Sequence, residues 1–116
     1  MIDERRRFPR FQIDQLIQLS YERESFVAAK GVNISEGGIL CITDAPVDIY
    51  SRVFLMLTLV FKERSEEKAN EITCEGIVNR CDPEGDIYYV GIQFTDLQEN
   101  EKRILKKYID FLEGSV

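Results

Sequence analysis

Apolar and polar residues alternate along most of the chain, and this period-2 pattern predicts β-strands. Between residues 11 and 21 the apolar side chains fall mainly at odd positions and the polar ones at even positions. Further stretches are rich in β-branched and aromatic residues and are separated by polar or glycine-containing turns. The predicted strands span residues 11–21, 26–34, 38–43, 52–61, 71–80 and 87–94.

Two places in this pattern are predicted to be irregular. Residues 62–70 are rich in Lys and Glu, and we expect them to form the long exposed loop of a hairpin between two strands. Gly91 interrupts the last strand, which predicts a bulge or a close approach of two backbones there.

The end of the chain changes to a helical period. The apolar residues at this spacing are Ile104, Leu105, Tyr108, Ile109 and Leu112. They predict a helix over residues about 97–113 whose apolar stripe packs on the core. Six short strands followed by one helix favour a mostly β fold, a six-stranded β-barrel with a C-terminal α-helix.

Charge is distributed unevenly over the 116 residues, a length typical of one domain. The net charge is −6, but residues 1–10 hold four Arg against two acidic residues, a local charge of +2 that leaves −8 on the rest of the chain. A basic segment beside an acidic body indicates a local anion site and argues against nucleic acid as a partner. We therefore predict a flexible arginine-rich arm at residues 1–10 and a barrel domain at residues 11–116.

The residue types that several common chemistries need are missing. The chain has no His, and Cys41, Cys74 and Cys81 form no C-x-x-C pair, so we expect no metal, no cofactor and no enzyme activity. An odd number of cysteines without a signal peptide indicates reduced thiols and a cytoplasmic location. The longest apolar run, residues 53–61, is about half the ~20 residues of a membrane-spanning helix, which predicts no membrane insertion.

The first of two candidate binding motifs is the arginine cluster RRRFPR at residues 5–10, in which Arg6 and Arg10 have the spacing R-x-x-x-R. The guanidinium group is a planar, permanently charged fork that can grip a phosphate, pair with the O6 and N7 edge of guanine or stack on a base. In an extended arm Arg6 and Arg10 can lie up to about 13 Å apart, which suits a ligand with two purines and two phosphates.

The second motif is the turn NISEGG at residues 33–38, of the form N-x-S-x-x-G. Asn33 can donate and accept hydrogen bonds, and Ser35 has a compact hydroxyl. Gly37 and Gly38 allow positive φ and a close approach of backbone N–H groups to an anion. Taken singly, an arginine-rich terminus is often a solvated tail and such a turn often only joins two strands, but their order and spacing favour a shared binding function.

Together these two motifs resemble those of PilZ domains, bacterial receptors for cyclic di-GMP. The strand VGIQFTDL at residues 90–97 and the terminal helix also resemble the family, so the resemblance covers nearly the whole chain. It implies a six-stranded antiparallel β-barrel with a C-terminal helix, in agreement with the pattern of apolar residues.

The resemblance also implies a role for each motif residue. Arg6 and Arg10 would contact the guanine edges and phosphates of cyclic di-GMP. Asn33 and Ser35 would contact a guanine or phosphate at the barrel surface, and Gly38 would keep the turn tight.

Three neighbouring residues extend the candidate site. Family members with an arginine directly before the first motif arginine tend to bind the ligand as an intercalated pair, and Arg5 holds this position, which implies two ligand molecules per chain. Arg7, inside the motif spacing, and Gly37, beside the motif glycine, are secondary candidates.

Two functions of different classes remain open. The first is a cyclic di-GMP sensor whose arm becomes ordered when ligand phosphates neutralise its mutually repelling arginines, so that a downstream protein sees a changed surface. Motility and biofilm formation are outputs that the resemblance implies. The second is an adaptor of the PilZ type that binds a motility or secretion protein without nucleotide.

Overall fold

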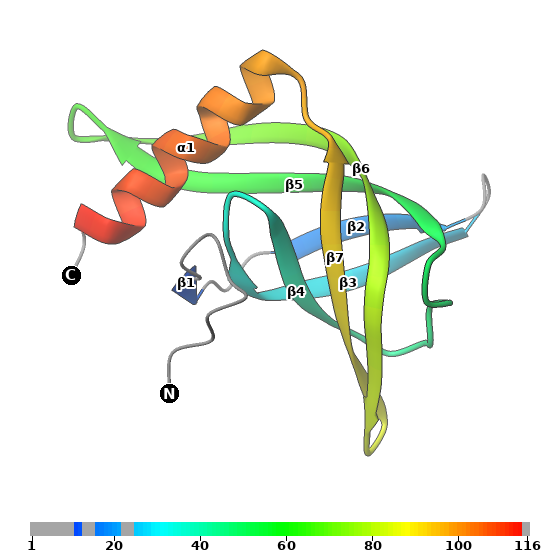
Figure 1. Ribbon diagram of the computed structural model, residues 1–116. Coiled ribbons are helices and arrows are strands. Elements are labelled where there is room, and N and C mark those ends of the chain that lie inside the picture. Colours follow the sequence, from blue (N-terminus) through cyan, green and yellow to red (C-terminus); the bar gives the residue numbers. More distant parts are fainter. Residues whose placement is uncertain (1–10, 13–15, 22–24, 115–116) are drawn as a thin grey trace, which may run out of the picture.

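The computed structural model describes residues 11–12, 16–21 and 25–114, which form seven strands and one helix (Figure 1). The elements are β1 Phe11–Gln12, β2 Leu16–Tyr21, β3 Ser25–Ile34, β4 Gly38–Thr43, β5 Arg52–Glu63, β6 Glu66–Glu84, β7 Ile87–Asp96 and α1 Glu99–Gly114. The arm expected at residues 1–10 lies outside the described residues, so the boundary between arm and barrel stays a prediction.

All strand pairings of the described residues are antiparallel. The strands are neighbours in the order β1-β3-β2-β5-β6-β7-β4, and β4 pairs with β3 as well as with β7. The sheet therefore curls strongly, and α1 crosses over β5 and β6 (Figure 1). The predicted mostly β fold with a C-terminal helix is confirmed.

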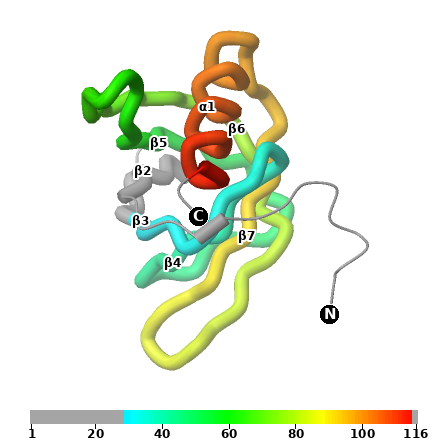
Figure 2. The backbone as a smooth tube through the Cα atoms, turned by 90° about the vertical axis from the view of Figure 1, so that its left-hand side faces the viewer, coloured from blue at the N-terminus to red at the C-terminus, as the bar shows by residue number. Residues whose placement is uncertain are grey.

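The regular six-stranded barrel predicted from the sequence needs correction. The described residues form seven strands of two to 19 residues. β5 and β6 also continue as a two-stranded hairpin beyond Leu57, where the described pairing of β2 with β5 ends. The result is a curled sheet with a projecting hairpin (Figure 2). Periodicity could not reveal this, because it assigns residues to strands without saying how far two neighbouring strands stay paired.

The hairpin predicted at residues 62–70 is confirmed, but its long loop is wrong, because the two strands stay paired almost to the tip. Arg64 and Ser65 alone form the turn, with φ of 55° and 68°. Positive φ at both central residues is the geometry of a type I′ turn, whose twist matches that of the flanking strands. Lys62 lies opposite Glu67, and cross-strand pairs of opposite charge stabilise an extended conformation despite the polar composition.

The irregularity predicted at Gly91 is confirmed. The register of β6 against β7 shifts between Val78 and Arg80, which leaves Asn79 as an extra residue opposite Gly91. A Cβ atom at Gly91 would lie 2.8 Å from Asn79 Oδ1. Glycine therefore allows the bulged strand to approach β7 closely at this point.

One hydrophobic core fills the inside of the curled sheet and continues under α1. Its members from β5 are Val53, Leu55, Leu57, Leu59 and Phe61, and its members from α1 are Leu105, Tyr108 and Ile109. The ring centroid of Phe61 lies 5.8 Å from that of Tyr108 and 6.1 Å from that of Phe111, with tilted planes that suit aromatic attraction. The apolar stripe predicted for the helix is therefore part of the core.

Two cysteines also belong to this core. Burial raises the pKa of the Cys41 and Cys74 thiols to about 12, with Asp96 and Glu101 adding to the effect at Cys74. Cys81 is only partly buried. The two buried thiols stay neutral and inert at ordinary pH, as expected of small core residues.

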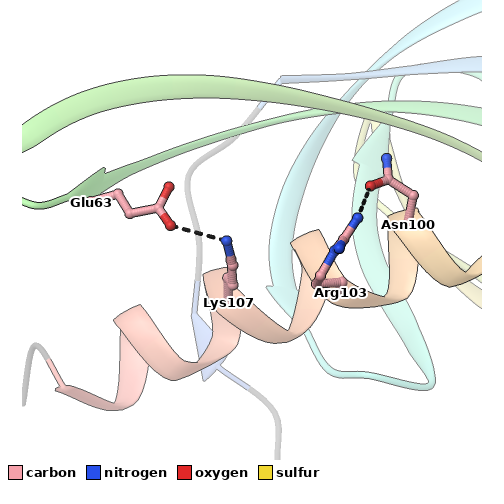
Figure 3. A network of polar contacts seen from close by, with 4 residues as sticks. All are labelled: Glu63, Asn100, Arg103 and Lys107. Carbon is pink, nitrogen blue, oxygen red and sulfur yellow. Dashed lines mark hydrogen bonds and ion pairs between the residues drawn. The ribbon is translucent and has the colours of Figure 1, made fainter.

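A polar contact ties α1 to the projecting hairpin. Lys107 Nζ lies 3.0 Å from Glu63 Oε1 (Figure 3), and this hydrogen bond and charge lower the pKa of the Glu63 carboxyl. Both side chains are well exposed, so the pair adds little to stability beside the aromatic packing. Arg103 donates a hydrogen bond to Asn100 on the same helix (Figure 3).

Within the described residues, no helix is long and apolar enough to cross a membrane.

Removing the Tyr108 ring should show how much the fold depends on the contact between α1 and the sheet. We expect Tyr108→Ala to lower the free energy of unfolding by about 3–5 kcal/mol, because it leaves a cavity beneath the helix. Lys106→Ala, at an exposed position of the same helix, should change it by less than about 0.5 kcal/mol. Equal urea midpoints for the two variants would contradict this account of the core.

Candidate functional site

The predicted turn joins β3 to β4, and Ser35 holds it together from within. The Ser35 side chain is almost completely buried, with a relative exposure of 3%. Its backbone N–H donates to the Gly38 carbonyl at 2.9 Å, and its hydroxyl lies 3.5 Å from the same oxygen. The Gly37 N–H donates to Ser35 Oγ at 3.1 Å. The hydroxyl is thus engaged inside the turn, which gives Ser35 a shaping role.

Gly38 is required for a different reason from the one predicted. Among the described glycines only Gly85 has a positive φ, so neither Gly37 nor Gly38 uses that freedom. Instead, a Cβ atom at Gly38 would lie 2.3 Å from the carbonyl oxygen of Ile92 on β7. Glycine is needed because β4 starts in direct backbone contact with β7, a tertiary constraint that local sequence does not reveal.

The turn is also fastened to β7 beyond this contact. Phe94 donates its backbone N–H to the Gly37 carbonyl at 3.0 Å, and Gly38 pairs with Gln93 in the ladder. Both glycines of the motif are therefore fixed by backbone interactions. The Gly37 N–H, which the sequence offered as an anion donor, is already bonded to Ser35.

Asn33 lies at an irregularity of the sheet. Its side chain is half-buried, and the register of β3 against β4 shifts between Gly31 and Asn33. Asn33 pairs with Leu40 on one side and with Gln12 of β1 on the other. Such shifts often re-aim a side chain next to a functional site.

The short strand β1 brings the N-terminal segment to this turn. Phe11 lies opposite Ile34, the residue between Asn33 and Ser35. The four candidate arginines lie outside the described residues; they are Arg5, Arg6, Arg7 and Arg10. The structure therefore places the turn next to β1, the strand that directly follows these arginines in the sequence.

Gln93 is a candidate that the sequence analysis missed. It is exposed, it pairs with Gly38 on one side and it pairs with Ile77 on the other. Gln93 is the single amide side chain of the predicted strand at residues 87–94. Its place next to the turn depends on a strand pairing that cannot be read from the sequence.

The described surroundings of the turn supply no metal site. No group of three or more His, Cys, Asp or Glu side chains within the described ranges could hold a metal ion. A hollow of about 310 Å³ lies elsewhere, beside α1, and Phe61 and Phe111 form part of its lining. Within the turn itself the charged residue is Glu36, so positive charge for an anionic ligand has to come from outside it.

Over residues 4–111 the sequence matches the family model of the PilZ domain, so the chain belongs to the PilZ domain family. This match includes both candidate motifs and most of α1. Among the curated proteins, none matches the sequence.

Several solved structures share the fold. One is the PilZ domain of YcgR from Escherichia coli with c-di-GMP, with a TM-score of 0.70 and 14% identity over 97% of this chain and 94% of that one. Another is the Bacillus subtilis inhibitor of motility MotI/DgrA, with a TM-score of 0.74 and 20% identity over 93% of this chain. A third is the K. pneumonia MrkH–c-di-GMP complex, with a TM-score of 0.74 and 22% identity over 98% of this chain. The chain spans 51% and 55% of the lengths of MotI/DgrA and MrkH.

A methyl group at Gly38 should test the contact between β4 and β7. Gly38→Ala would push a Cβ atom into the Ile92 carbonyl, and we expect it to lower the free energy of unfolding by about 1–3 kcal/mol. Gly114→Ala is the matched control, because no atom lies within 4 Å of a Cβ built there, and its effect should stay below about 0.5 kcal/mol. Thermal melts of equal midpoint for both variants would show that the turn tolerates a side chain.

Proposed function

We propose that the chain is a receptor for cyclic di-GMP that holds its ligand between the arm at residues 5–10 and the turn at residues 33–38. The observation that carries the proposal is the pairing of β1 with β3, in which Phe11 lies opposite Ile34 in the turn motif. Family membership supports it, since two of the similar solved structures contain c-di-GMP.

The covalent chain keeps both motif arginines within reach of the turn. Adjacent Cα atoms are about 3.8 Å apart, so Arg10 begins next to the Phe11–Ile34 pair. Arg6 can lie at most about 13 Å from Arg10. Because cyclic di-GMP carries two guanines and two phosphates, two arginine forks at such a separation can engage different parts of one molecule.

The turn residues have two proposed roles: some contact the ligand, and others hold the shape of the turn. Asn33, half-buried at the register shift, is the proposed direct contact with a guanine edge or phosphate. Ser35, Gly37 and Gly38 hold the shape of the turn through their internal bonds and the contact with β7. Gln93, exposed beside Gly38, is an additional candidate contact.

Signalling would follow from ordering of the arm. Four closely spaced arginines repel one another, and ligand phosphates would neutralise them and draw residues 5–10 against the turn. The rearranged arm would change the surface that a downstream protein meets. The proposed site residues include no pair of a nucleophile and a base, so we propose a site that binds its ligand without transforming it.

Arg5 decides the proposed stoichiometry. It precedes Arg6 directly and adds a further guanidinium fork, which we assign to a second, intercalated ligand molecule. Titration should therefore give two ligand molecules per wild-type chain and one per chain of the Arg5→Ala variant. A wild-type ratio of one would remove Arg5 from the proposal and leave the rest unchanged.

Isothermal titration with cyclic di-GMP tests the arginine contacts. Arg6→Ala and Arg10→Ala should each weaken binding roughly ten- to a hundredfold, because each charge-assisted contact is worth about 1.5–3 kcal/mol. Arg103→Ala on α1 removes the same charge far along the chain from the motifs and should leave the affinity unchanged. Unchanged affinity in Arg10→Ala would remove this residue from the site. Absence of saturable binding to the wild type would favour the nucleotide-independent adaptor.

A further inference from the structure

The start of β5 and the loop before it expose four large apolar side chains that are close together in the sequence. Phe54 and Met56 are 50% and 37% exposed, and they alternate with buried residues, so they lie on the outer face of the sheet. Ile49 and Tyr50, in the preceding loop, are 48% and 80% exposed. These are the large exposed hydrophobic residues of the described side chains, and all fall within residues 49–56. We call Ile49, Tyr50, Phe54 and Met56 the β5 apolar surface.

The loop part of this surface is held in a fixed and unfavourable backbone conformation. Tyr50 has a φ of 70°, a region that bulky residues rarely adopt. Its N–H donates to the Val78 carbonyl at 2.6 Å, and the Val78 N–H donates to the Ser51 carbonyl at 3.0 Å. Ser51 also donates from its N–H and its hydroxyl to the Asp48 carbonyl. The backbone that carries this exposed aromatic residue is thus anchored on β6, and local strain of this kind concentrates at functional sites.

Carboxylates border the surface on its β6 side. Glu75 lies opposite Phe54 in the ladder, and Asp96 of β7 lies opposite Glu75. Glu71 lies opposite Thr58, which puts it diagonal to Met56. On the other side, β2 contributes the uncharged residues Gln18 and Ser20 at the paired positions.

A cation, Arg52, lies beside these carboxylates at the start of β5. Arg52 is 67% exposed, and its Nε lies 4.0 Å from a Glu75 oxygen, a loose contact that leaves the border acidic overall. A second copy of this chain docking by the same face would bring these carboxylates against one another, which opposes association. Anionic surfaces such as nucleic acid or acidic lipid are disfavoured for the same reason.

We propose that the β5 apolar surface docks a segment of another protein that combines an apolar or aromatic anchor with Lys or Arg. The anchor would cover Phe54 and Met56, and the basic residues would face Glu71, Glu75 and Asp96. Tyr50, preorganised and almost fully exposed, would supply a contact with little loss of backbone freedom. This inference does not depend on cyclic di-GMP binding, because none of its residues belongs to the proposed ligand site.

Two synthetic peptides with the same alternating Leu and Phe residues test the proposal, one carrying Lys at the polar positions and the other Glu. Amide NMR spectra of the ¹⁵N-labelled full chain should shift at residues 49–56 and 71–77 with the Lys peptide. The Glu peptide should bind at least tenfold more weakly. Phe54→Ser should weaken binding of the Lys peptide at least tenfold, with a wild-type melting curve to show that this exposed change leaves the fold intact.

A charge reversal tests whether the acidic border itself, or only the net negative charge of the chain, selects the Lys peptide. Glu71→Lys/Glu75→Lys should reverse the preference between the two peptides. Glu84→Lys/Asp86→Lys makes the same change in net charge at exposed positions by the β6–β7 turn and should keep the preference of the wild type.

Three results would overturn the proposal. One is the absence of shifts at residues 49–56 with the Lys peptide at millimolar concentration, and another is equal binding by wild type and Phe54→Ser. The third is a dimer in sedimentation experiments that Phe54→Ser dissociates, because the occupant would then be a second copy of the chain.

Discussion

The candidate site depends on one contact, the approach of the β4 backbone to the β7 backbone at Gly38. A Cβ atom there would lie 2.3 Å from the Ile92 carbonyl, so the two strands meet at a distance that only glycine permits. This contact fixes where β4 begins, and the bonds from Ser35 to Gly38 and from Phe94 to Gly37 then fix the turn. The position of this turn then determines which residues lie beside β1, the strand that follows the arm.

The same contact begins a row of paired residues that crosses the sheet. Gly38 pairs with Gln93, Gln93 pairs with Ile77 and Ile77 pairs with Arg52 at the start of β5. Three strand spacings of about 4.8 Å separate the ends of this row, roughly 14 Å. The proposed ligand site and the β5 apolar surface are therefore near one another in the fold while sharing no residue. Binding at one site could affect the other only if this row of paired residues has two arrangements.

The sequence was informative where local chemistry decides structure. The start of β4 at Gly38 was predicted from the turn-forming residues before it, although the reason that glycine is needed there is tertiary, and the core face of α1, with Leu105 and Tyr108, follows from helical spacing. The hairpin turn at Arg64 and Ser65 could not be predicted, because a type I′ turn without Asn or Gly carries no recognisable pattern.

The candidate site was predictable to a similar extent. The sequence named the motif residues of the turn as candidates, and the family match spans them, while their binding roles stay a prediction. The structural surroundings of these residues could not be predicted, because the burial of Ser35, the Ile92 contact of Gly38 and the place of Gln93 all depend on β7, which is distant in sequence. Long-range pairing decides which polar atoms are free, and a local pattern does not contain that information.

The central claim is that the arm and the turn close on one ligand, and amide hydrogen exchange tests it most directly. Exchange would be followed for residues 5–10 and 33–38 of the full chain with and without saturating cyclic di-GMP, with the β6–β7 turn at Gly85 as an internal reference. The account predicts that the amides of both segments are protected together on ligand addition while the reference is unchanged. Protection of the turn with unchanged exchange in the arm would contradict the ordering mechanism, and no protection in either segment would contradict the proposed site.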